Sequence, residues 1–306
     1  MLRPASMCSI KEQVLPKANA DDQTPTTTPR APKIEIMRVG GRRLRVAVWK
    51  AVHKSGAKPA RPILFFNGIG ANIELMSPLA EWMSDRDIIT FDFPGVGGSP
   101  EPVFPYRPWT MSLRVARLLD KLGYEGKVDV MGVSWGGGMA QQFAFQHPRR
   151  VGKLILAATA AGMLMVPGDP KVLSKMADPR RYVDPDYMRK NFGALYSETL
   201  GSEDHISRLS PPSQRGYLYQ LAAMIGWTSA FFLPFVRTKT LVLMGEDDKI
   251  VPMINGKIMA TLLPHARLKT VPGGHLFLVS RPKETVPILR EFLAEDDAVE
   301  AMPRAA

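Results

Sequence analysis

Cysteine is almost absent from this sequence, and long hydrophobic runs are absent altogether. The chain has 306 residues and a single cysteine, Cys8, so it cannot form an intrachain disulfide. No apolar run approaches the roughly 18 residues that a membrane-spanning helix requires. The N-terminal stretch MLRPASMCSIKEQVLPKANADDQ is polar and lacks the apolar core of a secretory signal peptide. We therefore expect a cytoplasmic protein without a transmembrane segment.

Acidic residues are outnumbered by basic ones, but the basic excess is dispersed. The 40 lysines and arginines exceed the 29 acidic residues, which gives a formal net charge of +11. Such an excess suits an anionic partner such as nucleic acid or a membrane surface. The sequence has no long Lys/Arg block, and RVGGRRLRVAVWK alternates as a strand with an outward basic face does. We expect no nucleic-acid partner.

A regular alternation of strand and helix patterns runs through most of the chain. An early hairpin, IEIMRV and RLRVAVWK, turns at Gly40 and Gly41. Short apolar runs then indicate strands buried on both faces of a mostly parallel sheet: PILFFNG, DIITFDF, VDVMGV, KLILAAT and KTLVLMG. Amphipathic helix patterns lie between these strands. One of the predicted helices has an apolar face that consists of Met111, Val115, Leu118, Leu119 and Leu122. This order predicts a doubly wound α/β domain with helices on both faces.

One long insertion and two tails interrupt this order. Residues 161–237 separate two predicted strands by far more than an ordinary connection, and they carry helical patterns. We interpret them as an inserted helical cap on a core formed by residues 32–160 and 238–295. Residues 1–31 are rich in Thr, Pro and Lys and are predicted to be a disordered tail. Residues 296–306 form a C-terminal tail.

A serine stands at the end of a predicted strand in the stretch MGVSWGGG. Ser134 has a glycine two residues away on each side, which suits a sharp turn from strand to helix. In doubly wound sheets, ligands bind beyond the carboxyl ends of the strands. A serine hydroxyl becomes a good nucleophile only when a base takes its proton. Of the five histidines, His275 follows the last strand-like run in a glycine-rich loop, so it is the predicted base.

An acidic loop offers the third member of a triad. The stretch MGEDDKIVP ends the next-to-last predicted strand and contains Glu246, Asp247 and Asp248. A carboxylate there would fix the tautomer of the histidine. The order serine, aspartate, histidine is that of the α/β hydrolases. The residues themselves barely separate Asp247 from Asp248.

Two backbone N–H groups are predicted to form an oxyanion hole. One belongs to Trp135, which follows the serine, and the other to Ile69 in the loop NGIGAN. Glycines on both sides of Ile69 let that loop bend toward the site. The alternative interpretation, a dinucleotide-binding loop, lacks the third glycine of its motif. The predicted chemistry requires neither a metal nor a cofactor, and we expect none.

Several motifs together resemble one known family. The stretches GVSWGGGMAQQFA, FFNGIGANIELM, DFPGVGGSP, GWTS, GEDDKIVP and GGHLFLVSRP are similar to those of the intracellular depolymerases of medium-chain-length polyhydroxyalkanoates (PHA). The resemblance extends from about residue 34 to about residue 294 and includes the cap. It implies an α/β-hydrolase fold. It does not cover the N-terminal extension.

The resemblance also implies the roles of individual residues. Ser134 matches the nucleophile of the family and His275 matches its base. The family pattern places the acid four residues before Pro252, which points to Asp248 rather than Asp247.

The cap contains many aromatic and methionine side chains. Most of them would pack the cap onto the core, and the rest could line a slot for aliphatic side chains. Methionine adapts to variable ligand length, so Met163 and Met165 are candidates for this slot. Trp227, which begins the family-like WTS, is a third candidate, with a pure packing role as its alternative.

The resemblance implies a serine esterase that hydrolyses medium-chain-length PHA to 3-hydroxy acids or oligomers through an acyl-enzyme. The partner would be the polyester at the surface of a PHA granule in the cytoplasm, together with granule-associated proteins. A general carboxylesterase or monoglyceride lipase would use the same triad and stays open. A non-catalytic granule protein would not need Ser134, Asp248 and His275. A polymer synthase would carry cysteine at position 134, and a haloalkane dehalogenase or epoxide hydrolase would carry aspartate there.

Overall fold

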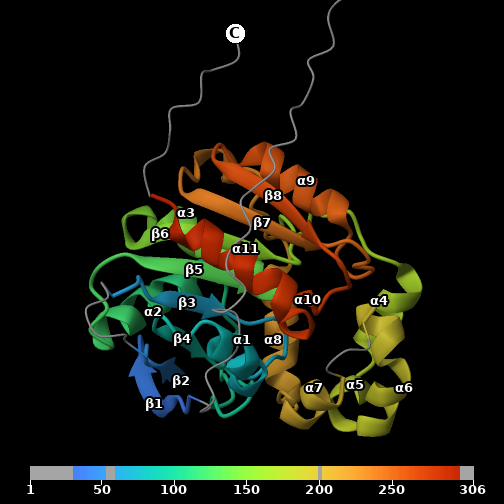
Figure 1. Cartoon of the computed structure of the whole chain (residues 1–306). Helices are drawn as coiled ribbons and strands as arrows, with labels where there is room; N and C mark the ends of the chain where they lie inside the picture. The colour runs from blue at the N-terminus through green and yellow to red at the C-terminus, as the bar shows by residue number, and fades with distance from the viewer. Residues whose placement is uncertain (1–29, 53–58, 199–201, 297–306) are drawn as a thin grey trace, which may run out of the picture.

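The computed structural model describes residues 30–52, 59–198 and 202–296, and a mixed sheet runs through its centre (Figure 1). The eight strands follow the order β1-β2-β4-β3-β5-β6-β7-β8. Strand β2 pairs antiparallel with β1 and β4, and the other neighbours are parallel. The strands are β1 (Lys33–Val39), β2 (Arg42–Trp49), β3 (Ile63–Phe66), β4 (Ile88–Phe91), β5 (Val128–Val133), β6 (Val151–Ala157), β7 (Lys239–Gly245) and β8 (Ala266–Val271). The prediction of a mostly parallel sheet is confirmed.

The predicted hairpin is formed by β1 and β2. Its register pairs Val39 with Arg42, so the connection consists of Gly40 and Gly41 alone. Both glycines have positive φ angles, 53° and 81°. A two-residue turn of this kind matches the twist of the two strands and strongly favours glycine. The local sequence therefore fixes this hairpin.

Helices cover both faces of the sheet, as predicted. One hydrophobic cluster joins the sheet to α2 (Pro108–Lys121), α3 (Trp135–Gln146) and α9 (Met253–Leu262). A second cluster joins the opposite face to α1 (Ser77–Trp82), α10 (Phe277–Ser280) and α11 (Pro282–Ala294). The predicted apolar face of α2 is buried at Met111, Val115, Leu118 and Leu119, and Leu122 is half-buried. The central strands are apolar along their length because both of their faces are buried.

A group of helices lies between β6 and β7 and occupies the lower right part of Figure 1. It consists of α4 (Pro170–Ala177), α5 (Arg180–Val183), α6 (Pro185–Tyr196), α7 (Ser202–Arg208) and α8 (Gln214–Met224). Side-chain caps begin several of them: Asp184, for example, accepts hydrogen bonds from the Asp186 and Tyr187 N–H groups. We refer to residues 161–237 as the cap, and its exact limits stay a prediction.

Short 3-10 helices complete the description: η2 (Ile73–Met76), η3 (Pro148–Arg150) and η4 (Leu233–Phe235). In the part of the chain that the structure describes, no helix combines the length and the apolar character needed to cross a bilayer. The two predicted tails fall almost entirely outside the described residues.

Candidate active site

Ser134 occupies a strained turn between β5 and α3. Its φ and ψ angles are 54° and −124°, a backbone conformation that residues other than glycine rarely adopt. Strain of this kind costs about 1–3 kcal/mol and persists only where neighbouring contacts enforce it. Here the Ser134 N–H donates to the Ala157 carbonyl at 2.9 Å, and the Thr159 hydroxyl donates to the Ser134 carbonyl at 2.6 Å. The turn therefore holds the serine at the carboxyl end of the central strand.

The two glycines of this turn are required by close backbone approaches. A Cβ on Gly132 would lie 2.8 Å from the carbonyl carbon of Gly136. A Cβ on Gly136 would lie 2.6 Å from the carbonyl carbon of Phe66, at the end of β3. Neither distance leaves room for a carbon atom, so strand, turn and helix can meet only where side chains are missing. The spacing seen in the sequence thus has a steric cause.

Ser134, His275 and Asp248 form a continuous hydrogen-bonded chain. His275 Nε2 lies 2.9 Å from Ser134 Oγ, and His275 Nδ1 lies 2.7 Å from Asp248 Oδ2. The other carboxylate oxygen, Asp248 Oδ1, accepts the N–H groups of Ile250 and Val251, each at 2.9 Å. His275 and Asp248 are both only 5% exposed. Both oxygens of the carboxylate are hydrogen-bonded, so it holds the imidazole in one orientation.

Asp247 lies outside this chain. Its side chain is exposed, and its backbone N–H donates to the Gly273 carbonyl at 3.0 Å. The structure thus places Asp248, not Asp247, against the histidine. The histidine loop is also fixed by the cap, because the His275 N–H donates to the Tyr196 carbonyl at 2.9 Å. A Cβ on Gly274 would lie 2.7 Å from the Tyr196 carbonyl carbon, which explains the glycine before His275.

The predicted oxyanion-hole residues lie beside the serine. Ile69 lines the same cavity as Ser134 and His275, and Trp135 is the first residue of α3. Among the described residues, neither of their backbone N–H groups has a hydrogen-bond acceptor. A Cβ on Gly68 would lie 3.8 Å from Ser134 Cβ, in ordinary contact. The loop therefore lies close to the serine, and the role of the two N–H groups as an oxyanion hole stays a prediction.

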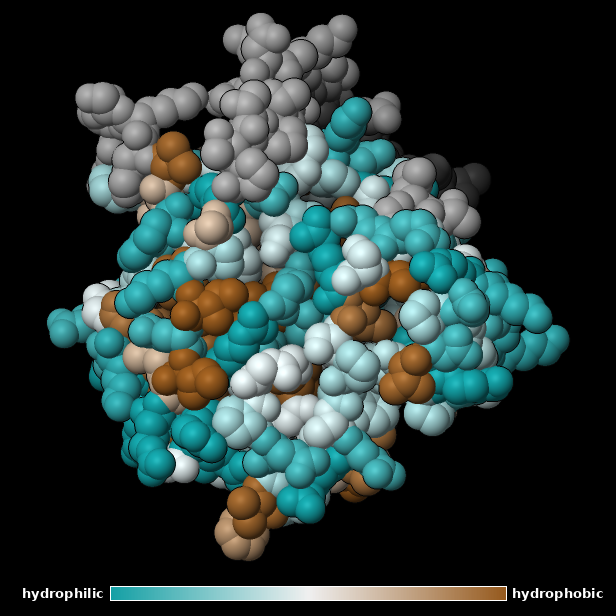
Figure 2. Space-filling model, turned by 90° about the horizontal axis from the view of Figure 1, so that it is seen from below, coloured by the Kyte–Doolittle hydropathy of each residue, from teal (hydrophilic) through white to brown (hydrophobic). Residues whose placement is uncertain are grey.

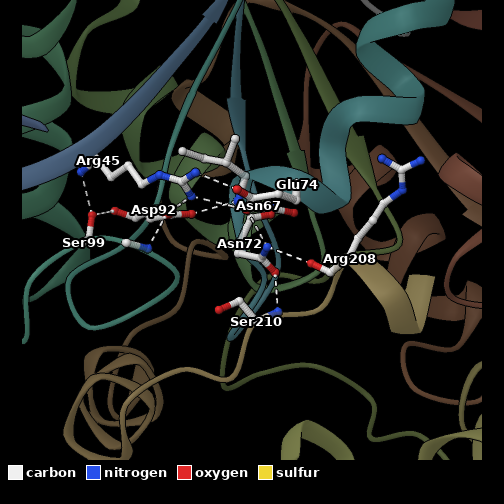
Figure 3. Close-up of polar contacts among 10 residues, drawn as sticks. Arg45, Asn67, Asn72, Glu74, Asp92, Ser99, Arg208 and Ser210 are labelled. Carbon is white, nitrogen blue, oxygen red and sulfur yellow. Dashed lines mark hydrogen bonds and ion pairs between the residues drawn. The ribbon is translucent and has the colours of Figure 1, made fainter. Parts of the chain in front are cut away.

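A polar network fixes the far end of the oxyanion loop (Figure 3). The Asn67 amide donates to the Asn72 carbonyl at 2.8 Å. The Asn72 amide in turn donates to Glu74 at 2.6 Å and to the Arg208 carbonyl at 2.9 Å, and its oxygen accepts the Ser210 N–H at 3.1 Å. Two short side chains thus join the loop to the end of α7 in the cap. Local sequence did not reveal this connection.

An ion-pair cluster around the buried Asp92 continues the network into the sheet. Arg45 of β2 contacts Asp92 at 3.1 Å and Glu74 at 2.6 Å (Figure 3). Asp92 also accepts the Ile73 and Gly98 N–H groups at 2.8 and 2.9 Å. Burial raises the pKa of Asp92, although these donors and Arg45 act in the opposite direction. Sequence reasoning missed Asp92; the only signal was its position at the end of a strand, in DFPGVGGSP.

The cavity beside Ser134 has a volume of about 90 Å³ and a mostly apolar lining. The core contributes Leu75, Met76, Leu276 and Val279, and the cap contributes Met176, Arg181, Tyr182, Tyr196, His205 and Leu209. Met176, Tyr182 and Tyr196 belong to the aromatic and methionine side chains from which the sequence predicted a slot. Sequence reasoning missed Arg181, His205 and Leu209, because nothing local distinguishes them from residues that pack the cap. No group of three His, Cys, Asp or Glu side chains within the described ranges could hold a metal ion.

The three predicted substrate-slot residues do not line this cavity. Trp227 is 5% exposed, and its indole N–H donates to Gln142 of α3 at 2.7 Å, so it packs the cap onto the core. Met163 is 61% exposed, and its sulfur accepts the Gly226 N–H at 2.6 Å. Met165 is half-buried against the core. The structure thus places all three residues away from the cavity beside Ser134, and their role in substrate binding stays a prediction.

Known proteins share both the sequence and the fold. A family model described as the alpha/beta hydrolase fold matches residues 61–205. A poly(3-hydroxyalkanoate) depolymerase of Ectopseudomonas oleovorans is 45% identical over 79% of this chain and 88% of its own length. A 2-hydroxymuconate semialdehyde hydrolase of Pseudomonas putida is 27% identical over 70% of this chain and 79% of its own length.

Solved structures agree on the architecture. An esterase from Exiguobacterium antarcticum aligns with a TM-score of 0.72 at 21% identity, covering 85% of this chain and 98% of its own. An enol-lactonase from Burkholderia xenovorans aligns with a TM-score of 0.68 at 20% identity, covering 85% and 100%. At such identities the likeness shows the fold alone. The sheet, the strained serine turn and the 45% identity together place the chain: it is a hydrolase of the α/β-hydrolase fold and belongs to the poly(3-hydroxyalkanoate) depolymerase family.

Proposed function

We propose that this protein hydrolyses the ester bonds of medium-chain-length poly(3-hydroxyalkanoate) through an acyl-enzyme on Ser134. The observation that carries the proposal is the hydrogen-bonded chain from Asp248 through His275 to Ser134 beside an apolar cavity. The 45% identity to a depolymerase of this polymer class supports the choice of substrate.

The mechanism follows from the positions of the reacting groups. His275 Nε2 accepts the Ser134 proton while its Nδ1–H donates to Asp248, and Ser134 Oγ attacks the ester carbonyl. The N–H groups of Ile69 and Trp135 bind the resulting oxyanion. The alkoxide of the leaving chain then takes the proton from His275, which leaves an acyl-serine. Water, deprotonated by His275, attacks the acyl-serine and releases the acid and the free serine.

The cavity lining supports a preference for aliphatic side chains of several carbons. Leu75, Met76, Met176 and Leu276 present apolar surface next to the reacting serine. Each additional methylene that becomes buried contributes about 0.8 kcal/mol, or nearly fourfold in specificity. A general carboxylesterase would use the same triad, and the substrate profile separates the two functions. A non-catalytic granule protein would gain nothing from the strained turn at Ser134.

Exposed apolar side chains support a location at the surface of the polymer granule. Met163, Leu164, Ile225 and Phe231 are each more than half exposed. They lie on two segments of the cap that pair through a bridge between Gly162 and Thr228. Figure 2 shows hydrophobic side chains on the face seen from below, separated by hydrophilic ones. Exposed apolar side chains gathered on two paired segments offer a surface for contact with the polyester.

Acid release from amorphous polymer tests the proposed function. The wild-type protein should release 3-hydroxy acids faster from the medium-chain polymer than from the methyl-bearing polymer. Ser134→Ala should lose most of its turnover, by roughly 10⁴–10⁶-fold, while it still sediments with granules. A wild type that cleaves only soluble p-nitrophenyl esters would contradict the polymer assignment. A Ser134→Ala variant with a tenth of the wild-type rate would contradict the acyl-enzyme.

A further inference from the structure

A buried arginine of the cap stands on the wall of the reaction cavity. Arg181 of α5 is 4% exposed and lines the same cavity as Ser134 and His275. None of the described residues that line this cavity is acidic. Within the described ranges, no carboxylate forms an ion pair with Arg181, and its buried Nε has no hydrogen-bond partner. A cation thus faces the site of ester cleavage without a counter-ion.

The groups around Arg181 are uncharged. One guanidinium nitrogen hydrogen-bonds to the hydroxyl of Tyr182 and, at 3.1 Å, to that of Tyr217. The guanidinium lies over the Tyr182 ring, 4.0 Å from its centroid. Burial raises the pKa of the Tyr182 and Tyr196 hydroxyls, so both stay protonated at neutral pH. The phenols orient the guanidinium, but they supply no negative charge.

Another buried arginine, Arg86, has the acidic partners that Arg181 lacks among the described residues. Arg86 is 7% exposed, and its guanidinium lies 2.9 Å from Asp85 and 3.7 Å from Asp129. Arg45 similarly contacts Glu74 and Asp92. A buried charge without a partner is strongly destabilising, whereas a charge held by hydrogen bonds at a ligand site is stabilised when an anion binds. The environment of Arg181 is that of an anion site.

The proposed substrate contains one suitable anion. Each polyester chain ends in a 3-hydroxyacyl unit with a free carboxylate. Two carbon atoms separate the last ester oxygen from that carboxylate carbon, so a guanidinium in the same small cavity can reach it. Guanidinium and carboxylate form two parallel hydrogen bonds, which would fix the terminal unit.

We propose that Arg181 binds the terminal carboxylate of the polyester or oligomer, so that the enzyme removes 3-hydroxy acid units from the carboxyl end. This inference rests on the proposed function. Ser134 attacks the last ester carbonyl, and the acyl group that becomes attached to the serine is the rest of the polymer chain. The leaving group is the terminal 3-hydroxy acid. Its departing alkoxide oxygen takes the proton from His275 and becomes the hydroxyl, while its carboxylate stays on Arg181. Cleavage is therefore exo-acting on chains with a free acid end.

The test compares two forms of one substrate. The dimer of 3-hydroxyoctanoic acid is offered as the free acid at pH 8 and as its methyl ester, and cleavage of the ester bond between the two units is followed by chromatography of the monomeric products. In the wild type, kcat/KM should be at least tenfold higher for the free acid, since hydrogen bonds to charged groups discriminate by that factor or more. In Arg181→Met, the acid-to-ester ratio should fall to about one or below.

Two further variants make the test specific. Arg180→Met makes the same change at the neighbouring residue, which is exposed and pairs with Asp178 at 2.7 Å, and should keep the wild-type ratio. Arg181→Lys retains the charge without the planar fork and should give an intermediate ratio. A wild-type ratio near one overturns the inference whether or not any variant folds. An unchanged ratio in Arg181→Met also overturns it.

The outcomes separate this inference from the proposed function. If both dimer forms and the polymer are cleaved with no preference for the free acid, only the role of Arg181 fails. If neither the polymer nor the dimers are cleaved while p-nitrophenyl octanoate is, the proposed function itself fails.

Discussion

Replacing Gly136 with alanine should damage catalysis through the backbone alone. The added Cβ would lie 2.6 Å from the carbonyl carbon of Phe66, and closer still to the Phe66 and Asn67 oxygens. Ordinary contacts of a Cβ begin near 3.4 Å. The start of α3 and the end of β3 must therefore separate by roughly 1 Å. Trp135 is the first residue of α3, and Ile69 lies just beyond the end of β3. The separation of these two elements therefore widens the predicted oxyanion hole.

The magnitude follows from that displacement. A misplacement of about 1 Å can reduce the rate by about 10²-fold, and loss of one oxyanion donor reduces kcat by about 10²–10³-fold. We expect a decrease in this range for kcat on p-nitrophenyl octanoate. Overpacking should also lower the free energy of unfolding by about 1–3 kcal/mol, which a denaturant titration measures.

Gly138→Ala is the matched control in the same helix. Its Cβ would lie 3.0 Å from the end of the flexible Met224 side chain and 3.1 Å from the Trp227 ring, so it meets side chains of the cap and no backbone of the core. Both substitutions gain about 1 kcal/mol of helix propensity, so a difference between them reports the steric contact. We expect Gly138→Ala to keep kcat within a few-fold of the wild type. If Gly136→Ala also did so, the close approach of helix and strand would not position the reacting groups.

Two further predictions concern charged groups of the site. Asp248→Asn should lower kcat/KM by about 10⁴-fold by misorienting His275, whereas Asp247→Asn, whose side chain is exposed, should lower it only a few-fold; the reverse ranking would contradict the assignment. Burial lowers the pKa of His205 from 6.5 to about 4, so below pH 6.5 the unfolded chain binds a proton that the folded protein excludes. The free energy of unfolding should therefore fall by about 2 kcal/mol between pH 7 and pH 5, and His205→Gln should lack this part of the decrease. Equal pH dependence of both proteins in urea titrations would refute this explanation.

The strands and the three residues of the hydrogen-bonded chain could be predicted because their signals are local. A two-residue glycine turn fixes the first hairpin, and continuous apolar runs mark strands that are buried on both faces. The order of serine, acid and histidine along the chain then places them at neighbouring strand ends. The residues themselves could not show which aspartate turns inward. The loop conformation that directs the Ile250 and Val251 N–H groups at Asp248 leaves no trace in a single sequence.

The cap could not be predicted in the same way. Its helices are short, and their orientation is set by contacts with distant parts of the chain. An aromatic such as Trp227 is buried whether it lines a ligand site or packs one layer on another, so its residue type cannot separate the two roles. The burial of Arg181 could not be predicted either, because an arginine in a short helix is usually solvent-exposed. Only its burial next to the serine supports the role that we propose for it.

The cap does more than cover the site, because it holds both loops that the chemistry needs. The Tyr196 carbonyl accepts the His275 N–H, and the Tyr182 hydroxyl donates to the Ile69 carbonyl at 3.0 Å. Gln220 of α8 accepts the Gly70 N–H at 2.9 Å and the Trp135 indole N–H at 3.0 Å. A large outward movement of the cap would break these bonds and release the histidine and oxyanion loops together. Access that leaves the site intact must therefore come from a local opening, and a chain end passes such an opening more readily than the middle of a polymer.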